Sequence, residues 1–409
     1  MRLLHAADLH IDSPLRGLSR LEDDDLAEQL RAATRQATRN LVELATTQRV
    51  DAVLLAGDIY DGDWRDYATG AFFIQQMSQL VDAGMRVFLV SGNHDAASSI
   101  TRTLRLPTGV TALPRDAPGT SFVDDLGLAV HGQGFARRDV TENLAAAYPR
   151  RVPGLVNVGL LHTAVTGRPG HDTYAPCSVA DLTALGYEYM ALGHVHTRET
   201  LASGATTVAF PGNLQGRHPR ETGPKGALLV EVEPGQPARL EFHALDAARW
   251  AHLALDVSVP QSLEEVLDAI DTALADEVDQ SEGRPVVTRI TLTGRTPAAA
   301  ELVDTDRIET EIRLLAERRR AAVERVRVQV TEPMAADPAD EGLRAGVLAT
   351  AQEWGADPGR LRTELAALRR ELGADVTEQL DLGDPGTLRE LLDEAARMLD
   401  ARLAGGGAA

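Results

Sequence analysis

The sequence is poor in cysteine, aromatic residues and lysine. Its 409 residues contain one cysteine, Cys177, which rules out an internal disulfide and disfavours a sulfur-ligated zinc site. Aromatic residues form 4% of the chain, which argues against a surface that stacks nucleic-acid bases. Lys225 is the only lysine among 41 basic residues. These absences leave oxygen and imidazole ligands as the main candidates for any metal chemistry.

The chain also lacks a basic segment and a long apolar run. The formal net charge is −20, and residues 1–250, 251–331 and 332–409 carry −6, −6 and −8. This balance argues against nucleic-acid binding driven by global charge, but it leaves room for a local basic groove or metal-mediated phosphate binding. No run of roughly 18 apolar residues occurs, and the start MRLLHAADLH has no apolar signal core. We therefore expect a cytoplasmic protein without a membrane segment.

The first 250 residues alternate short apolar runs with helical patterns, which predicts an α/β domain. The later strands follow one another with little helix between them, so we expect more antiparallel pairing there. The expected strands are 2–7, 52–56, 86–90, 128–131, 156–161, 187–192, 206–210, 227–232 and 239–244, and the expected helices are 24–47 and 67–82.

Two further segments follow the α/β domain. Residues 251–331 read as a small α+β domain, with strands at 250–259, 286–293 and 323–330 and helices at 262–279 and 304–320. Residues 333–340 read as a linker, and helices are expected at 341–354, 358–372 and 385–403 in a C-terminal region, 332–409. The apolar positions of these last helices pack either on the chain itself or on a partner, and their spacing does not choose between the two.

Polar blocks follow five of the expected strands, where parallel strands of an open sheet bring functional groups together. A lone histidine is more often a packed residue than a ligand, and each block alone is a weak signal. Together, Asp, Asn and His from separate strands predict a metal site, and they suit Mn²⁺, Fe²⁺ or Zn²⁺. The blocks are Asp8-Leu9-His10, Gly57-Asp58, Gly92-Asn93-His94-Asp95, Leu161-His162-Thr163 and Gly193-His194-Val195-His196.

This series of D-x-H, G-D, G-N-H-D, H and G-H-x-H resembles the calcineurin-like metallophosphoesterase superfamily. The runs LLHAADLHIDSP and FPGNLQGRHPRETGPKG are similar to those of SbcD-like DNA repair nucleases, specifically the YhaO-like branch. The resemblance implies a four-layer α/β/β/α domain over 1–250, a small α+β capping or DNA-binding domain over 251–331, and a helical C-terminal tail.

The resemblance also implies a role for each polar residue. Two divalent metal ions, Mn²⁺ first with Fe²⁺ and Zn²⁺ as alternatives, share Asp58 as a bridging ligand. His94 faces the scissile phosphate and Asp95 orients it. The implied ligands of one ion are Asp8, His10, Asp58 and His196, and those of the other are Asp58, Asn93, His162 and His194.

A basic cluster between residues 216 and 226 is a second candidate site. Its residues Arg217, His218, Arg220 and Lys225 are expected to hold the substrate backbone, and the alternative is a solvated basic turn. One position departs from the family pattern: Asp61 stands where related nucleases often carry a histidine, in G-D-x-x-H. That departure puts an exonuclease mode in doubt.

The resulting expectation is a metal-dependent phosphodiesterase that acts on single-stranded DNA or duplex ends in DNA repair, as an exonuclease, an endonuclease or both. The resemblance implies an SbcC/YhaN-like coiled-coil ATPase as partner, with a homodimer left open. Two alternatives remain: another metallophosphoesterase activity, on small nucleotides or as a phosphatase, and a non-catalytic scaffold for such an ATPase.

Overall fold

The computed structural model describes residues 1–13, 24–61, 67–97, 105–165, 174–332, 338–364 and 384–405. The chain divides into two compact units, Met1–Trp250 and Ala251–Ala409. Each unit is described by itself below.

Unit 1 contains a first, mixed sheet whose central strands β1, β2 and β3 are almost entirely buried. Strands β1 to β4 run parallel to one another, and β11 pairs antiparallel with β1. The parallel register aligns Ala6 of β1 with Leu55 of β2, and Leu55 with Leu89 of β3, so these three strands end at the same edge. The sheet order is β12 (Arg239–Ala244), β11 (Gly226–Glu231), β1 (Arg2–Ala6), β2 (Ala52–Leu55), β3 (Arg86–Leu89) and β4 (Val110–Ala112).

The second sheet is largely parallel. Its inner strands β6, β7, β8 and β10 run parallel, and only the edge strands β5 and β9 are antiparallel to their neighbours. The expected antiparallel pairing of the later strands therefore occurs at the edges of this sheet and between β11 and β12, whereas the inner strands of this sheet are parallel. The order is β5 (Gly119–Val123), β6 (Leu128–Gln133), β7 (Val156–His162), β8 (Tyr189–Gly193), β10 (Thr207–Phe210) and β9 (Glu199–Ser203).

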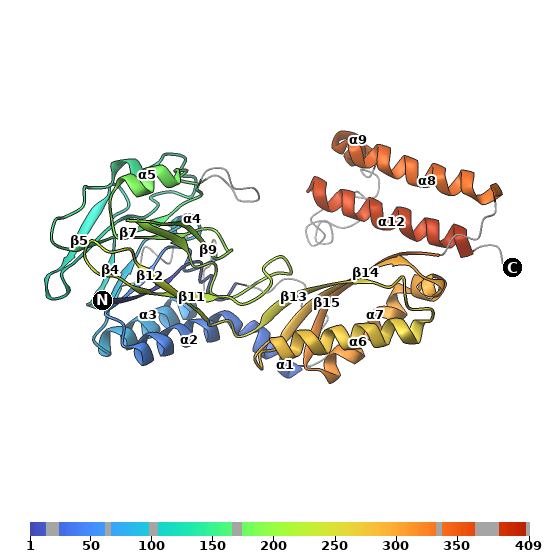
Figure 1. The fold of residues 1–409 in the computed structure, drawn as a ribbon, viewed down its shortest axis with the longest axis horizontal. Helices are drawn as coiled ribbons and strands as arrows, with labels where there is room; N and C mark the ends of the chain where they lie inside the picture. The colour runs from blue at the N-terminus through green and yellow to red at the C-terminus, as the bar shows by residue number, and fades with distance from the viewer. Residues whose placement is uncertain are drawn as a thin grey trace. The chain divides into compact units, whose positions relative to one another are not determined.

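Helices lie outside both sheets, and the two sheets face each other. One core packs α2 and α3 on the first sheet, a second fills the space between the sheets, and a third packs α5 on the second sheet (Figure 1). The sequence periodicity explains this, since buried positions such as Leu41 of α2 and Met77 of α3 lie on one helical face. The helices of unit 1 are α1 (Asp24–Arg31), α2 (Ala33–Gln48), α3 (Tyr67–Asp82), α4 (Asn93–Ala97) and α5 (Val179–Ala184), with 3₁₀ turns η1 (Asp124–Leu126) and η2 (Leu144–Ala147).

Two histidines outside the metal-site blocks serve structure. His5 Nε2 donates to the Leu192 carbonyl at 3.1 Å, so its Nδ1 accepts from the Tyr189 hydroxyl at 2.7 Å. Burial lowers the pKa of His5 to about 3. His131 is fully buried and lies 4.4 Å from the Tyr187 ring, centroid to centroid, in a stacked arrangement.

Unit 2 begins with a three-stranded sheet in which β14 and β15 run parallel. Ser262 caps α6 by accepting a hydrogen bond from the Glu265 N–H at 3.3 Å. The elements are β13 (Arg249–Asp256), which crosses the boundary between the units, α6 (Leu263–Gln280), β14 (Val286–Arg295), η3 (Pro297–Val303), α7 (Thr305–Arg318), β15 (Ala321–Thr331), α8 (Pro338–Ala356), α9 (Pro358–Glu364) and α12 (Pro385–Gly405).

The C-terminal helices pack on one another and on the small sheet. Leu361 of α9 and Leu388 of α12 are each 1% exposed and form one cluster, while Arg327 of β15 binds Glu390 at 2.8 Å. Leu391 and Leu392 pack against this cluster, so the described part of the apolar face contacts the chain's own helices, and the alternative of a docked partner stays open. Of the helix expected at 358–372, residues 365–372 lie outside the described part. None of the described helices is both long and apolar enough to cross a membrane.

Candidate metal centre

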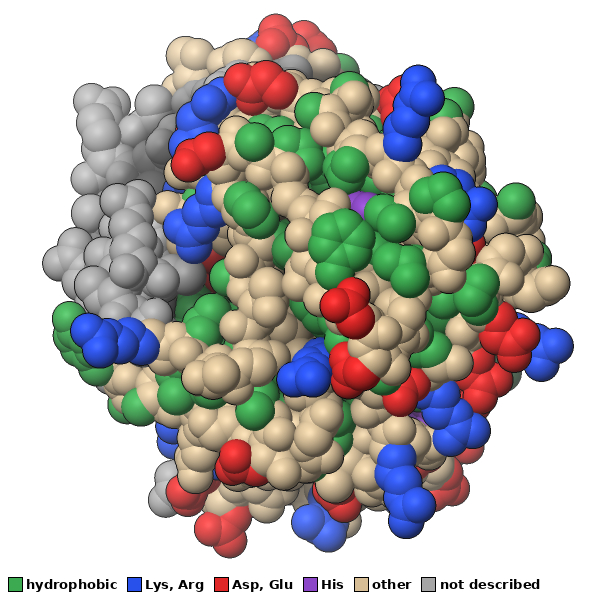
Figure 2. All heavy atoms as spheres, turned by 90° about the vertical axis from the view of Figure 1, so that its left-hand side faces the viewer, with side chains coloured by type: hydrophobic (Ala, Val, Ile, Leu, Met, Phe, Trp, Pro, Cys, Tyr) green, Lys and Arg blue, Asp and Glu red, His purple; other side chains and the backbone are tan. Residues whose placement is uncertain are grey.

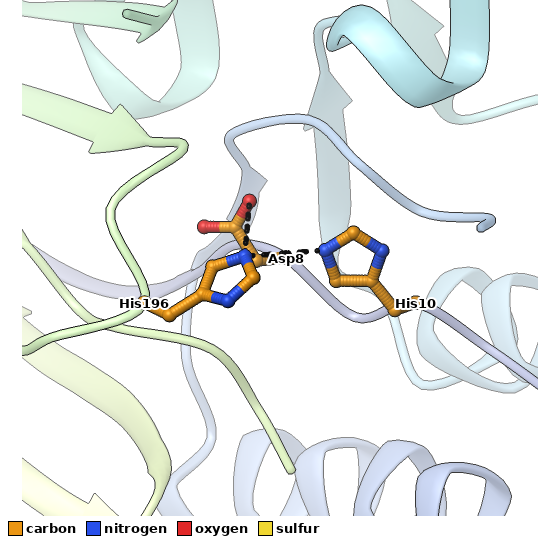
Figure 3. A group of neighbouring side chains, drawn as sticks. All are labelled: Asp8, His10 and His196. Carbon is orange, nitrogen blue, oxygen red and sulfur yellow. Dashed lines mark hydrogen bonds and ion pairs between the residues drawn. The ribbon is translucent and has the colours of Figure 1, made fainter. Parts of the chain in front are cut away.

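The polar blocks converge at one edge of the two facing sheets, where β1, β2, β3, β7 and β8 end. The first cluster contains Asp8 and His10, which follow β1, and His196, which follows β8. Its ligand atoms lie within 4.8 Å of one another, and the three side chains point together in Figure 3. Asp8 and His10 are 1% exposed, so the cluster lies inside the protein.

The donor atoms in this cluster have the spacing of ligands on one metal ion. His10 Nε2 and His196 Nε2 are 3.3 Å apart. Two nitrogens that each lie about 2.1 Å from an ion are separated by roughly 3.0–3.4 Å in octahedral or tetrahedral geometry. Glu221 accepts a hydrogen bond from His196 Nδ1, so a neutral His196 directs the Nε2 lone pair toward His10. The residues therefore fit a divalent cation.

A second cluster joins His162, at the end of β7, to Asn93 and Asp58. His162 Nδ1 lies 2.9 Å from the Ala56 carbonyl, which can only accept, so this nitrogen carries the proton. Burial lowers the pKa of His162 to about 3, which leaves Nε2 with a bare lone pair. That lone pair faces Asn93 Oδ1 at 3.0 Å and Asp58 Oδ2 at 3.5 Å. Three acceptors in contact repel one another, and a cation among them converts that repulsion into attraction.

Asp58 lies between the two clusters. Its Oδ2 atom is 3.5 Å from His162 Nε2 and 4.0 Å from His10 Nε2. Burial raises the pKa of Asp58 to about 6, and burial followed by the Asp58 charge raises the pKa of Asp8 well above its ordinary value. Two carboxylates held this way are costly to ionise unless positive charge lies beside them, which again favours cations.

His194 completes the predicted set. Its backbone N–H donates to Asp8 Oδ2 at 3.0 Å, and its ring lies 5.2 Å from the His162 ring, centroid to centroid. His162 of β7 pairs with Gly193 of β8, the residue before His194. This register brings His162 and His194 to the same level of the sheet. All seven predicted ligands are therefore brought together at this edge.

Two glycines make this close approach feasible. A Cβ at Gly57, which has a φ of +91°, would lie 2.6 Å from His162 Nδ1. A Cβ at Gly92 would lie 2.2 Å from Asp58 Oδ1. Both glycines therefore make room for the ligand side chains of neighbouring blocks.

The environment of His94 differs from the expectation. The Asp95 carboxylate, expected to orient His94, instead accepts from the backbone N–H groups of Ile59, Tyr60 and Gly92 at 3.0–3.1 Å. The carboxylate beside the His94 ring is Asp61, whose Oδ1 lies 3.2 Å from His94 Nδ1. Asp95 therefore holds together the loops that carry Asp58 and Asn93. The role expected of Asp95, contact with the His94 ring, belongs to Asp61.

Asp61 also contacts His10 and the basic loop. Its Oδ1 lies 3.6 Å from His10 Nδ1, and its Oδ2 accepts from Ser13 Oγ at 2.7 Å and lies 3.5 Å from Arg217 Nη1. Partial burial opposes ionisation, but the contacts with His10, and then Arg217 and Ser13, hold the pKa of Asp61 below its usual range. Asp61 is therefore a charged link between the first cluster and His94.

The four basic residues expected to bind substrate have different environments. Arg217 lies at the site, 14% exposed, with Nη1 donating to Ser13 Oγ at 3.0 Å and a buried Nε that has no partner within the described ranges. His218 is 37% exposed and its Nε2 lies 3.3 Å from Glu221 Oε1. Arg220 is exposed. Lys225 is buried, and its Nζ donates to the His196 carbonyl at 3.0 Å. Because its ammonium group binds the His196 backbone, Lys225 stabilises the segment that carries His196.

Glu221 is a residue that the sequence reasoning missed. It lies within the basic loop, is 5% exposed, and accepts from His196 Nδ1, from Asn213 Nδ2 at 2.9 Å and from the Arg217 N–H at 2.7 Å. Burial raises its pKa, but the hydrogen bonds from His196 and His218 outweigh burial and hold the pKa far below the usual range. The sequence signal that could have identified Glu221 is its position as a single acidic residue within the basic cluster at residues 216–226.

Comparison with known proteins agrees with this site. Residues 1–198 match the calcineurin-like phosphoesterase family, and residues 250–331 match the middle domain of metallophosphoesterase YhaO. The uncharacterized metallophosphoesterase YhaO of Bacillus subtilis (strain 168) is 32% identical over 302 residues, which cover 73% of this chain and 72% of the relative. This chain is a calcineurin-like metallophosphoesterase. Within that family, this metallophosphoesterase is YhaO-like.

More distant relatives include repair proteins. The SbcD component of the nuclease SbcCD of Bacillus subtilis (strain 168) is 24% identical over 279 residues, 58% of this chain and 68% of the relative. The DNA double-strand break repair protein Mre11 of Aeropyrum pernix is 29% identical over 254 residues, 58% of this chain and 59% of the relative. The family expected from the motifs is therefore confirmed.

Proposed function

We propose that this metallophosphoesterase is a two-metal DNA phosphodiesterase of the SbcD-like kind. The observation that carries the proposal is the pair of clusters around Asp58: His10 Nε2 and His196 Nε2 lie 3.3 Å apart in one, and His162 Nε2 lies 3.0 Å from Asn93 Oδ1 in the other. Mn²⁺ is the proposed metal, because mixed carboxylate, amide and imidazole ligands suit it, with Fe²⁺ and Zn²⁺ as alternatives. When bound, two such cations lower the pKa of water and neutralise phosphate charge.

His94 is the proposed general acid. Its side chain is 30% exposed, so a substrate can reach it, and its ring lies 5.1 Å from the His10 ring, centroid to centroid. Asp61 holds His94 through Nδ1, which leaves Nε2 to face the leaving oxygen of a phosphodiester. Arg217 is the proposed phosphate contact, because its guanidinium lies beside Ser13 and Asp61 at the metal centre and its side chain is 14% exposed. His218 and Arg220 form the outer, exposed part of the same surface.

DNA as substrate is supported by the repair proteins among the relatives. The face of unit 1 shown in Figure 2 carries acidic and basic side chains mixed with apolar ones, so no basic surface covers that face. We place the contact with the phosphate backbone at the metal centre and Arg217, whose Nη1 lies 3.5 Å from Asp61. We extend the proposal to residues 251–331 as a capping domain that holds the DNA, and to an SbcC/YhaN-like coiled-coil ATPase as partner of residues 332–409.

The test compares turnover of single-stranded DNA, duplex DNA with defined ends, a cyclic nucleotide and a phosphopeptide, each with Mn²⁺. We expect DNA to be hydrolysed with the highest kcat/KM. A cyclic nucleotide or phosphopeptide that is preferred by orders of magnitude would replace the DNA assignment with the corresponding phosphodiesterase or phosphatase. Turnover of none of them by a protein that binds two Mn²⁺ ions would favour the scaffold.

A further inference from the structure

The loop that follows β10 contains an acid with an unusual set of partners. Glu221 accepts hydrogen bonds from the ring of His196, the amide of Asn213 and the backbone of Arg217, and His218 Nε2 lies 3.3 Å from its Oε1. We infer that Glu221 is a positioning residue that fixes the tautomer of His196 for metal binding and ties the Arg217 loop to the metal centre. This inference rests on the proposed two-metal site.

The first step is the geometry at His196. Glu221 Oε1 lies 2.5 Å from His196 Nδ1, and a carboxylate oxygen can only accept. The proton of the neutral ring therefore stays on Nδ1, and the Nε2 lone pair faces His10 Nε2 at 3.3 Å. Carboxylates that hold a metal-binding histidine in this way raise metal affinity.

The second step is the other oxygen of the same carboxylate. Glu221 Oε2 accepts from the Arg217 N–H at 2.7 Å and from Asn213 Nδ2 at 2.9 Å. Arg217 in turn reaches Ser13 Oγ and lies 3.5 Å from Asp61. One buried side chain therefore fixes a metal-binding histidine and the start of the loop that carries the phosphate-contacting arginine.

In Glu221→Gln, one carboxylate oxygen becomes an NH₂ group, so the side chain can no longer accept hydrogen bonds at both positions. If the oxygen of Glu221→Gln stays on His196, its NH₂ group meets two donors, on Arg217 and Asn213. If the oxygen turns to those donors, the NH₂ group faces His196 Nδ1, which must then accept, and the ring proton moves to Nε2. The second arrangement satisfies the donors of Arg217 and Asn213 and leaves the partly exposed His218 Nε2 facing the NH₂ group, but it removes the lone pair from the metal position.

The test measures Mn²⁺ binding to the full chain, from the loss of the free-ion signal in electron paramagnetic resonance during titration. We expect two equivalents in the unmodified protein. In Glu221→Gln and Glu221→Ala we expect the affinity for one equivalent to fall roughly 10- to 100-fold, with the other unchanged. In a His196→Ala background, Glu221→Gln should cause no further loss, because its effect passes through His196.

Glu188→Gln is the matched control. Glu188 is a 2% exposed carboxylate that accepts from Arg151, from the Asn157 N–H and from the Gly235 N–H, at the end of β8 opposite to His194. This variant should lose thermal stability and keep both Mn²⁺ equivalents.

Three results would overturn the inference: Glu221 variants that bind both ions with unchanged affinity, a further loss in the His196→Ala background, or an equal loss of affinity in Glu188→Gln. An unmodified protein that binds no Mn²⁺ would overturn the proposed function instead.

Discussion

The contact between Asp61 and His94 gives the sharpest test of the proposed chemistry. At the 3.2 Å between Asp61 Oδ1 and His94 Nδ1, a unit ion pair has a Coulomb energy of about 5 kcal/mol at an effective dielectric constant of about 20. The two side chains are 25% and 30% exposed, so solvent screening reduces the net contribution to about 2 kcal/mol. If that interaction stabilises the transition state, Asp61→Asn lowers kcat about 30-fold.

The assay is steady-state hydrolysis of a chromogenic phosphodiester and of DNA with Mn²⁺. Asp61→Asn should keep two Mn²⁺ ions, because Asp61 is not one of the proposed metal ligands. Asp12→Asn is the matched control, since Asp12 is a carboxylate paired with Arg35 at 2.5 Å, with no contact to His94 among the described residues. It should change kcat less than threefold. An Asp61→Asn enzyme with unchanged kcat, or a control that loses as much, would refute the role of Asp61.

Four further predictions concern Asp58, His94, Arg217 and His5. Asp58→Asn should abolish Mn²⁺ binding at one or both positions, measured by elemental analysis, because Asp58 lies between the clusters. His94→Gln should retain the metal ions and lose roughly 10²- to 10⁴-fold in kcat, and retention of full kcat would contradict its acid role. Arg217→Ala should raise KM for DNA at least tenfold, whereas the exposed Arg220→Ala should change it less than threefold. His5, whose pKa burial lowers to about 3, contributes stability that is present above pH 6.5 and is lost as the pH falls below it. Urea unfolding should therefore show a loss of stability between pH 7.5 and 4.5 that is about 3 kcal/mol smaller in His5→Gln than in the unmodified protein; equal losses in both proteins would contradict this.

The sequence predicts the inner strands and the order of the polar blocks well, for a physical reason. Inner strands such as Val156–His162 are buried along their whole length, so they appear as continuous apolar runs. Parallel register then places the ends of such strands at one edge, which makes the convergence of Asp8, Asp58 and His162 predictable. The edge strands β4, β5 and β9 were missed because they are short and partly exposed.

Side-chain partners across loops are harder to predict. The expected contact of Asp95 with His94 assumed that neighbours in sequence interact, but Asp95 lies on the first turn of α4 and reaches the loop after β2. Lys225 appeared to be a substrate ligand because it lies in a basic cluster, yet the chain folds it inward onto the His196 carbonyl. Local composition gives the charge of a loop and not the direction in which each side chain points.

The backbone at the site explains why these ligands face one another. Spacing of two residues predicts that Asp8 and His10 lie on one side of an extended strand, but both adopt a positive φ, 51° and 41°, just beyond β1. Asp58 and His194 also have positive φ values, 51° and 104°. Such conformations cost of order 1–3 kcal/mol each for residues other than glycine, and aspartate and histidine are among the side chains that adopt them most readily. Aspartate and histidine therefore fit this site for two reasons. They are suitable ligands for a divalent cation, and they adopt the positive φ values of the turns that direct their side chains into the site. Since the surrounding strands must stabilise those turns, the metal centre depends on the buried strands β1, β2 and β8 as well as on its ligands.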